Sequence, residues 1–138
     1  MTDEASNRPP AVILIVEDEP LLRELAVGLV EDAGFVALEA GDAGQAVAHL
    51  EARADIAVMF TDIQMPGCMD GLKLAHMVRD RWPPIKILVA SGRIRLRPCD
   101  LPSDSAFLEK PYRGEAVIAR LRSLVDPART LIGSDLLS

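Results

Sequence analysis

Apolar and polar residues follow two patterns along this chain, one typical of β-strands and one typical of α-helices. Five short apolar runs predict strands at residues 12–16, 35–40, 55–61, 85–90 and 105–109. Four further segments carry apolar residues at helical spacing, marked by Leu22, Leu25, Ala26 and Leu29, by Ala43, Ala46, Val47 and Leu50, by Leu74, Ala75 and Val78, and by Val117, Ile118, Leu121, Leu124 and Val125. Pro20 suits the first turn of the first helix and Gly34 its end, and we expect the last helix to cover 111–125. This alternation predicts an α/β fold with a parallel sheet and helices on both faces.

The first, third and fourth apolar runs are almost wholly apolar, whereas the second and fifth are weaker. We therefore expect the first, third and fourth strands in the centre of the sheet and the second and fifth strands at its edges. The result is a five-stranded, flavodoxin-like sheet with the strand order 2-1-3-4-5. Between the fourth and fifth strands, Gly92, Pro98 and Pro102 leave room for one or two helical turns at most, so the fourth helix should be short or irregular.

The 138 residues suit one domain, with 49% hydrophobic and 26% charged residues. We expect a flexible N-terminus at 1–10, the domain at 11–126 and a tail at 127–138. No apolar stretch approaches the ~20 residues that cross a membrane, and the polar start does not resemble a secretion signal, so a cytoplasmic location is expected. The net charge of −6 argues against nucleic acid as the main partner.

Carboxylates stand where the first and third predicted strands end. Glu17 and Asp18 follow the first run, and Asp62 ends the third. In a sheet of this order, ligands bind beyond the carboxyl ends of the strands where the winding reverses, which is between these two. Because Mg²⁺ prefers oxygen ligands, we expect a magnesium site here. Asp18 and Asp62 would bind directly, Glu17 through water, and Gln64 with its main-chain carbonyl.

A hydroxyl and an ammonium, those of Ser91 and Lys110, stand at the ends of the next two strands. Phosphoryl transfer depends mostly on positioning and on stabilisation of charge. Asp62 is the candidate nucleophile, because a carboxylate can attack a phosphoryl group and form an acyl phosphate. The metal and Lys110 would neutralise the transferring oxygens, and Ser91 would donate a hydrogen bond to one of them.

In this order, the motifs resemble the receiver domain of bacterial two-component response regulators. The matching elements are Val16-Glu17-Asp18-Glu19, Thr61-Asp62, Met65-Pro66, Met69-Asp70-Gly71, Ala90-Ser91-Gly92 and Phe107-Leu108-Glu109-Lys110-Pro111-Tyr112. They cover nearly the whole chain, and their succession on strand ends is far more specific than any one of them. The chain also resembles the single-domain, chemotaxis-type receivers of alphaproteobacteria.

The resemblance implies that Asp62 accepts a phosphoryl group from a histidine kinase or a histidine phosphotransfer protein, with Mg²⁺ required. It also implies that Ser91 is the switch hydroxyl, that Phe107 is the switch aromatic, and that the Lys110–Pro111 peptide is cis. Since little chain follows residue 125, we expect no output domain here and a signal passed to a downstream protein target. The kinase, the target and the formation of a homodimer stay open.

Two departures from the family pattern and three alternatives accompany this interpretation. Cys68 lengthens the loop after Pro66 by one residue, and the short fourth-helix region affects the usual output face.

The chain could instead be the receiver part of a longer regulator or hybrid kinase. A phosphatase of the haloacid-dehalogenase type would need a second aspartate where Gln64 stands. In a carrier of flavin phosphate, the Glu17-Asp18-Glu19 cluster would repel the phosphate of the flavin.

Overall fold

Five parallel strands form one sheet in the computed structural model, which describes residues 10–63, 71–91, 101–102 and 105–125. The strands are β1 (Val12–Val16), β2 (Val36–Ala40), β3 (Ile56–Asp62), β4 (Lys86–Ser91) and β5 (Ser105–Glu109). Their order is β2-β1-β3-β4-β5, and every pairing is parallel. The predicted α/β fold and strand order are confirmed.

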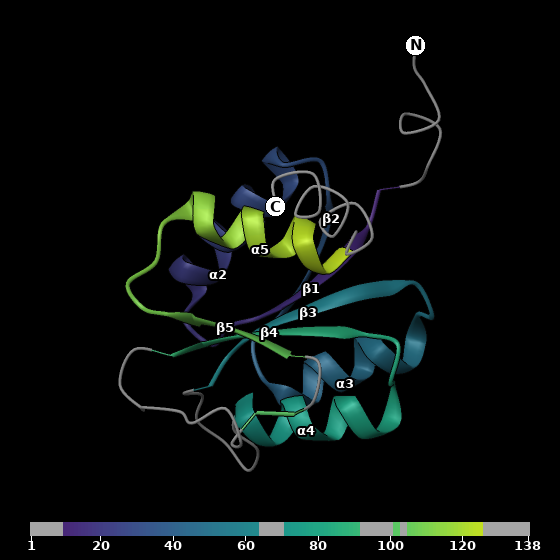
Figure 1. Ribbon diagram of the computed structural model, residues 1–138. Coiled ribbons are helices and arrows are strands. Elements are labelled where there is room, and N and C mark those ends of the chain that lie inside the picture. The colour runs from purple at the N-terminus through teal and green to yellow at the C-terminus, as the bar shows by residue number, and fades with distance from the viewer. Residues whose placement is uncertain (1–9, 64–70, 92–100, 103–104, 126–138) are drawn as a thin grey trace, which may run out of the picture.

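Helices cover both faces of the sheet (Figure 1). One face carries α2 (Pro20–Asp32) and α5 (Gly114–Val125), and the other carries α3 (Ala43–Ala52) and α4 (Gly71–Arg81). Each pair of helices closes its own apolar cluster against the sheet. All five residues of β1 are buried, whereas β2 and β5 each have one buried residue. This difference follows from the apolar content of the strands, since a central parallel strand is covered on both sides.

Both ends of α2 agree with the prediction from the sequence, whereas α5 starts later than predicted. Pro20 stands in the first turn of α2, and Gly34 follows this helix with a φ of 95°, a conformation that glycine adopts readily. The helix α5 begins at Gly114 and not at the expected residue 111. Its first turn starts at Arg113, whose carbonyl accepts the N–H groups of Ala116 and Val117.

Several sequence predictions concern residues outside the described ranges. These are the flexible N-terminus, the Gln64 carbonyl, Cys68, most of the fourth-helix region and the C-terminal tail, within 1–9, 64–70, 92–100, 103–104 and 126–138. Among the described helices, none has the length and apolar character that a bilayer crossing requires.

Candidate functional site

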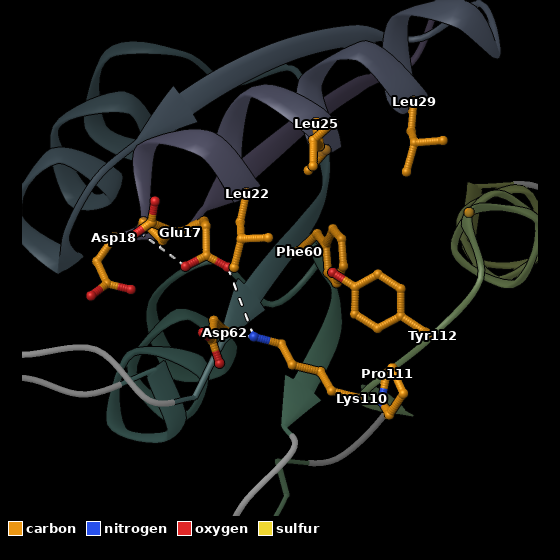
Figure 2. A pocket seen from close by; sticks show the side chains of 13 residues that line it. Glu17, Asp18, Leu22, Leu25, Leu29, Phe60, Asp62, Lys110, Pro111 and Tyr112 are labelled. Carbon is orange, nitrogen blue, oxygen red and sulfur yellow. Dashed lines mark hydrogen bonds and ion pairs between the residues drawn. The ribbon is translucent and has the colours of Figure 1, made fainter.

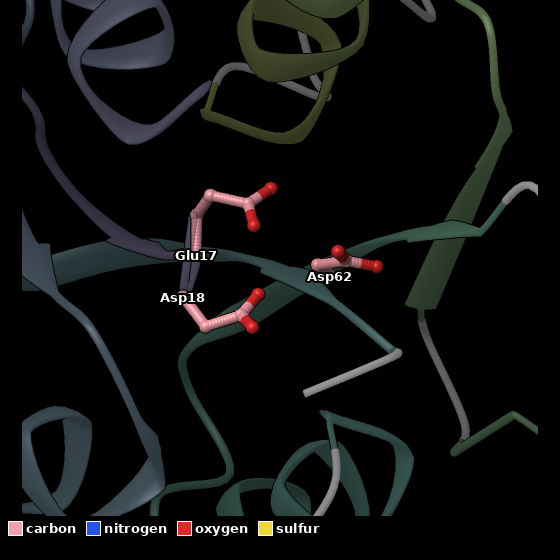
Figure 3. Close-up of side chains that lie close together, drawn as sticks. All are labelled: Glu17, Asp18 and Asp62. Carbon is pink, nitrogen blue, oxygen red and sulfur yellow. The ribbon is translucent and has the colours of Figure 1, made fainter. Parts of the chain in front are cut away.

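Three carboxylates meet beyond the ends of β1 and β3 (Figure 3). The sheet register pairs Val16 with Thr61, so the next residues on the two strands are Glu17 and Asp62. One carboxylate oxygen each from Glu17, Asp18 and Asp62 lies within 4.8 Å of the others. Glu17 and Asp62 are buried, at 8% exposure each. Such close carboxylates repel one another unless a cation compensates them.

Lys110 supplies one such cation from the end of β5. Its Nζ donates to Oδ2 of Asp62 at 3.0 Å and lies 3.9 Å from Oε1 of Glu17. The main chain fixes this approach, because the Lys110 N–H donates to the Ser91 carbonyl at 2.9 Å. The peptide bond between Lys110 and Pro111 is cis. The Lys110 ammonium thus lies close to two of the three acids, Asp62 and Glu17.

The pKa values of Glu17 and Lys110 are both raised in this cluster. Burial, with further contributions from the Asp62 charge, raises the pKa of Glu17 from 4.5 to about 6, although the Glu19 N–H bonds to its carboxylate. Burial alone would lower the pKa of Lys110, but the hydrogen bond to Asp62 and the charges of Asp62 and Glu17 outweigh it and raise that pKa. Lys110 therefore stays an ammonium at neutral pH.

The donor set fits a hard divalent cation. It consists of carboxylate oxygens with more negative charge than the ammonium of Lys110 balances. Mg²⁺ is held in proteins by one or two carboxylates together with waters and phosphate oxygens. Asp18 is only partly buried, so one side of the cluster is open to water and substrate oxygens. The residues present could therefore hold Mg²⁺.

The metal-free protein is expected to lose stability through Glu17 as the pH rises. Its pKa is about 6 in the folded protein against 4.5 in the unfolded chain, so the folded state binds this proton more tightly. The resulting stabilisation is complete below pH 4.5 and disappears as the pH passes 6, and it amounts to about 1–2 kcal/mol.

Chemical denaturation in EDTA between about pH 4 and pH 8 measures this effect. Glu17→Gln should remove that part of the pH dependence, and Glu24→Gln, an exposed acid on α2, should keep it. A wild-type pH profile unchanged by Glu17→Gln would refute the assignment.

Ser91 and Phe107 lie on strands next to the acids. Ser91 ends β4, is 1% exposed and stands between the ends of β3 and β5. Phe107 pairs with Val89 and packs, partly buried, against the apolar cluster beneath α3 and α4. Both residues are thus placed where a change at Asp62 could reach them through neighbouring strands.

An apolar groove of about 790 Å³ opens onto the acids between α2 and α5 (Figure 2). Leu22, Leu25 and Leu29 line one side along α2, with Phe60 and Tyr112 across from them. The two rings are 6.0 Å apart between centroids. Leu22 is 46% and Leu25 58% exposed, although their spacing is that of a buried helix face.

The helices α2 and α5 approach each other closely at one end of this groove. A Cβ added to Gly114 would lie 2.7 Å from Leu29, so the two helices meet near this glycine. Val30 is the fully buried residue of α2. The sequence pattern predicts no role for Tyr112, although its amphipathic ring directly after Lys110 and Pro111 is a signal for one.

Gly71 is required by a close approach to the main chain of Asp62. Its N–H donates to the Ile63 carbonyl at 3.0 Å, and a Cβ added there would collide with the Asp62 carbonyl oxygen. Gly71→Ala is therefore expected to lower the free energy of unfolding by about 1–3 kcal/mol. Urea denaturation of the wild type and the variant measures this change in the free energy of unfolding.

The same substitution at Gly28 is the control, because an added Cβ there meets open space within α2. Gly28→Ala should stabilise the protein by about 0.5–1 kcal/mol, since alanine loses less backbone entropy in a helix. If both variants stabilised, the tight contact at Gly71 would be disproved.

Comparison with known proteins supports this fold. The response regulator receiver domain profile matches residues 13–122. The crystal structure of a response regulator receiver protein from Sinorhizobium medicae superposes with a TM-score of 0.79 at 28% identity, covering 85% of this chain and 95% of that one. The chain belongs to the response regulator receiver domain family, the signalling modules of two-component systems.

Curated relatives differ in how much of their length the chain covers. Nitrogen assimilation regulatory protein NtrX of Azorhizobium caulinodans is 32% identical over 77% of this chain, which spans 24% of that protein. The probable transcriptional regulatory protein TcrX of Mycobacterium tuberculosis is 32% identical over 84% of this chain, which covers 50% of that protein. The response regulator receiver protein CpdR of Brucella abortus is 30% identical over 87% of the chain, which covers 95% of it. The chain therefore spans half or less of the first two relatives and nearly all of the third.

Proposed function

We propose that Asp62 accepts a phosphoryl group from a phosphorylated histidine of a histidine kinase or histidine phosphotransfer protein, in a reaction that requires Mg²⁺. The observation that carries this proposal is the buried Asp62 carboxylate, with the Lys110 ammonium 3.0 Å away and two more acids beside it. Receiver domains as a family interact with such donors.

The chemistry is one displacement at phosphorus. A carboxylate oxygen of Asp62 forms a bond to phosphorus while the bond from phosphorus to the histidine nitrogen breaks, and the imidazole leaves with that electron pair and takes up a proton. Lys110, already bonded to Asp62, neutralises developing charge on the phosphoryl oxygens, and Ser91 donates to one of them. Mg²⁺ bound by Asp18 and Asp62, with Glu17 acting through water and the Gln64 carbonyl as a further ligand, would supply additional positive charge there.

The proposal is tested by incubating the protein with acetyl phosphate, with Mg²⁺ or with EDTA. Intact-mass spectrometry should detect one phosphoryl adduct with Mg²⁺ and none with EDTA. An adduct that formed equally well in both would contradict the role of the metal, and the lack of any adduct would contradict the proposal.

The groove beside Asp62 supports the approach of a protein donor from this side. A phosphohistidine must reach bonding distance of Asp62, so the donor has to cover the surface around it. Exposed apolar side chains on that surface, including Leu25, would then be buried by contact. Together with the acids at its mouth, this groove favours an apolar donor surface flanked by basic residues.

Leu25→Ala is expected to slow phosphotransfer from a protein donor by about fivefold to tenfold, because an apolar contact is lost. Phosphorylation by acetyl phosphate should be unchanged. Val36→Ala is the matched control, since Val36 is an exposed aliphatic residue at the far end of β2. Quenched time courses with phosphorylated kinase measure the phosphotransfer rates of both variants. Equal rates for the Leu25→Ala variant and wild type would exclude this groove as the docking surface.

Signal output completes the proposal. Phosphorylation of Asp62 would shift Ser91 and Phe107 and so alter a surface that a downstream protein target binds, in the cytoplasm. The chain covers 95% of CpdR and 24% of NtrX, so its relatives include both a regulator of about this length and a receiver within a longer protein. Membership of the receiver family leaves the phosphatase and flavin-carrier alternatives without support.

A further inference from the structure

Arg23 links Glu17 of the acidic cluster to the edge strand β2. It lies in the first turn of α2, and its side chain is 24% exposed. Its Nη1 donates to the main-chain carbonyl of Glu17 at 2.9 Å, and its Nε donates to Oε1 of Glu39 at 3.3 Å. The guanidinium thus ties the loop after β1 to the end of β2.

The carbonyl that Arg23 holds belongs to the peptide bond between Glu17 and Asp18. The sheet ladder ends at this point: the Glu17 N–H still donates to Ala40, but the Gly41 N–H turns away to the Gln45 side chain at 2.7 Å. Arg23 supplies a donor for the Glu17 carbonyl at the point where strand pairing stops. Because one peptide plane joins the two acids, its orientation sets the direction from which both side chains start.

Space for the guanidinium is provided by Gly41. A Cβ added to this glycine would lie 3.1 Å from Nη1 of Arg23, so the guanidinium lies close against the main chain there. The arrangement is therefore fixed on two sides, by a hydrogen bond to the Glu17 carbonyl and by contact with Gly41. A surface arginine held only by Glu39, whose side chain is 56% exposed, would not be fixed in this way.

We propose that Arg23 is a positioning residue for the metal site: it holds the Glu17–Asp18 peptide so that the acids are preorganised for Mg²⁺. This inference rests on the proposed function. Arg23 would act on the acids indirectly, through its hydrogen bond to the Glu17 carbonyl. Partners that orient metal ligands typically change metal affinity by about 10–100-fold when removed.

The direction of the change in Mg²⁺ affinity distinguishes a positioning role of Arg23 from the effect of its charge. Arg23 is a cation near a cation site, so loss of its charge alone would strengthen Mg²⁺ binding. Loss of positioning would weaken it. Arg23→Met keeps an unbranched stem beside Gly41 and removes the guanidinium, and we expect Mg²⁺ affinity about tenfold lower by isothermal titration calorimetry.

Glu39→Gln is the matched control, because it removes the ion pair and leaves the bond to the Glu17 carbonyl. Its Mg²⁺ affinity should stay within about twofold of wild type. In metal-free protein, the Asp18 amide resonance should shift in Arg23→Met and stay in place in Glu39→Gln, since this amide shares the peptide plane with the bonded carbonyl. Arg23→Gln, too short to reach that carbonyl, should match Arg23→Met and replaces it if Arg23→Met does not fold.

Equal or tighter Mg²⁺ binding by folded Arg23 variants would overturn the inference, as would an equal loss in Glu39→Gln. These results are distinct from failure of the proposed function. If wild-type protein itself did not bind Mg²⁺, the metal site and the role of Arg23 would both be refuted. If wild type binds and the Arg23 variants bind equally well, the role of Arg23 alone is refuted.

Discussion

Asp62→Asn is expected to abolish phosphorylation, with incorporation from acetyl phosphate at least about 100-fold below wild type. The amide has the shape of the carboxylate but lacks its nucleophilic oxygen. Asp62 is buried and bonded to Lys110, and its carboxylate lies beside those of Glu17 and Asp18. Loss of one negative charge from this cluster relieves repulsion, so the variant should fold at least as stably as wild type in EDTA.

Intact-mass measurements and thermal melts of the Asp62→Asn variant provide the comparison. Asp55→Asn is the control, because Asp55 is an exposed acid paired with Arg53. It should be phosphorylated normally. Phosphoryl incorporation that survives Asp62→Asn in folded protein would show that another residue is the acceptor.

Asp18→Asn is expected to reduce Mg²⁺ affinity by about 100-fold or more, because a neutral amide oxygen replaces a carboxylate ligand and the site loses a negative charge. Phosphorylation should fall with it at a fixed low concentration of Mg²⁺ and partly recover at high concentration. Calorimetric titration of Mg²⁺ into the variant measures the first effect, and the dependence of labelling on Mg²⁺ measures the second.

The control for Asp18→Asn is Asp42→Asn, which removes the same charge from another loop at the end of a strand. Asp42 caps α3 by accepting the Gln45 N–H at 2.8 Å, and asparagine caps a helix about as well. Its Mg²⁺ affinity should stay near that of wild type. Unchanged affinity in Asp18→Asn would remove Asp18 from the metal site.

Strand order and strand ends were predictable because their signals are local. Runs such as 12–16 are apolar at every position, and only a central parallel strand buries both faces. The acids follow these runs directly, so once the order is known, the parallel register brings Glu17 next to Asp62. That part of the candidate site needed no knowledge of side-chain packing.

Other features depended on how elements approach each other in space. Helical spacing places Leu22 and Leu25 on one face of α2 but cannot say whether α5 covers that face, and in the structure both are exposed. The late start of α5 depends on the path of the chain after Lys110. Likewise, the bond from Arg23 to Glu17 depends on the close approach that Gly41 permits.

The central claim is that Asp18 and Asp62 hold Mg²⁺ while Asp62 accepts the phosphoryl group beside Lys110. A crystal structure with Mg²⁺ and beryllofluoride, a mimic of the phosphoryl group, tests it most directly. We predict the metal in contact with carboxylate oxygens of both aspartates, beryllium bonded to Asp62, and Nζ of Lys110 donating to a fluoride. Metal or adduct bound elsewhere, or Lys110 turned away from a modified Asp62, would contradict the claim.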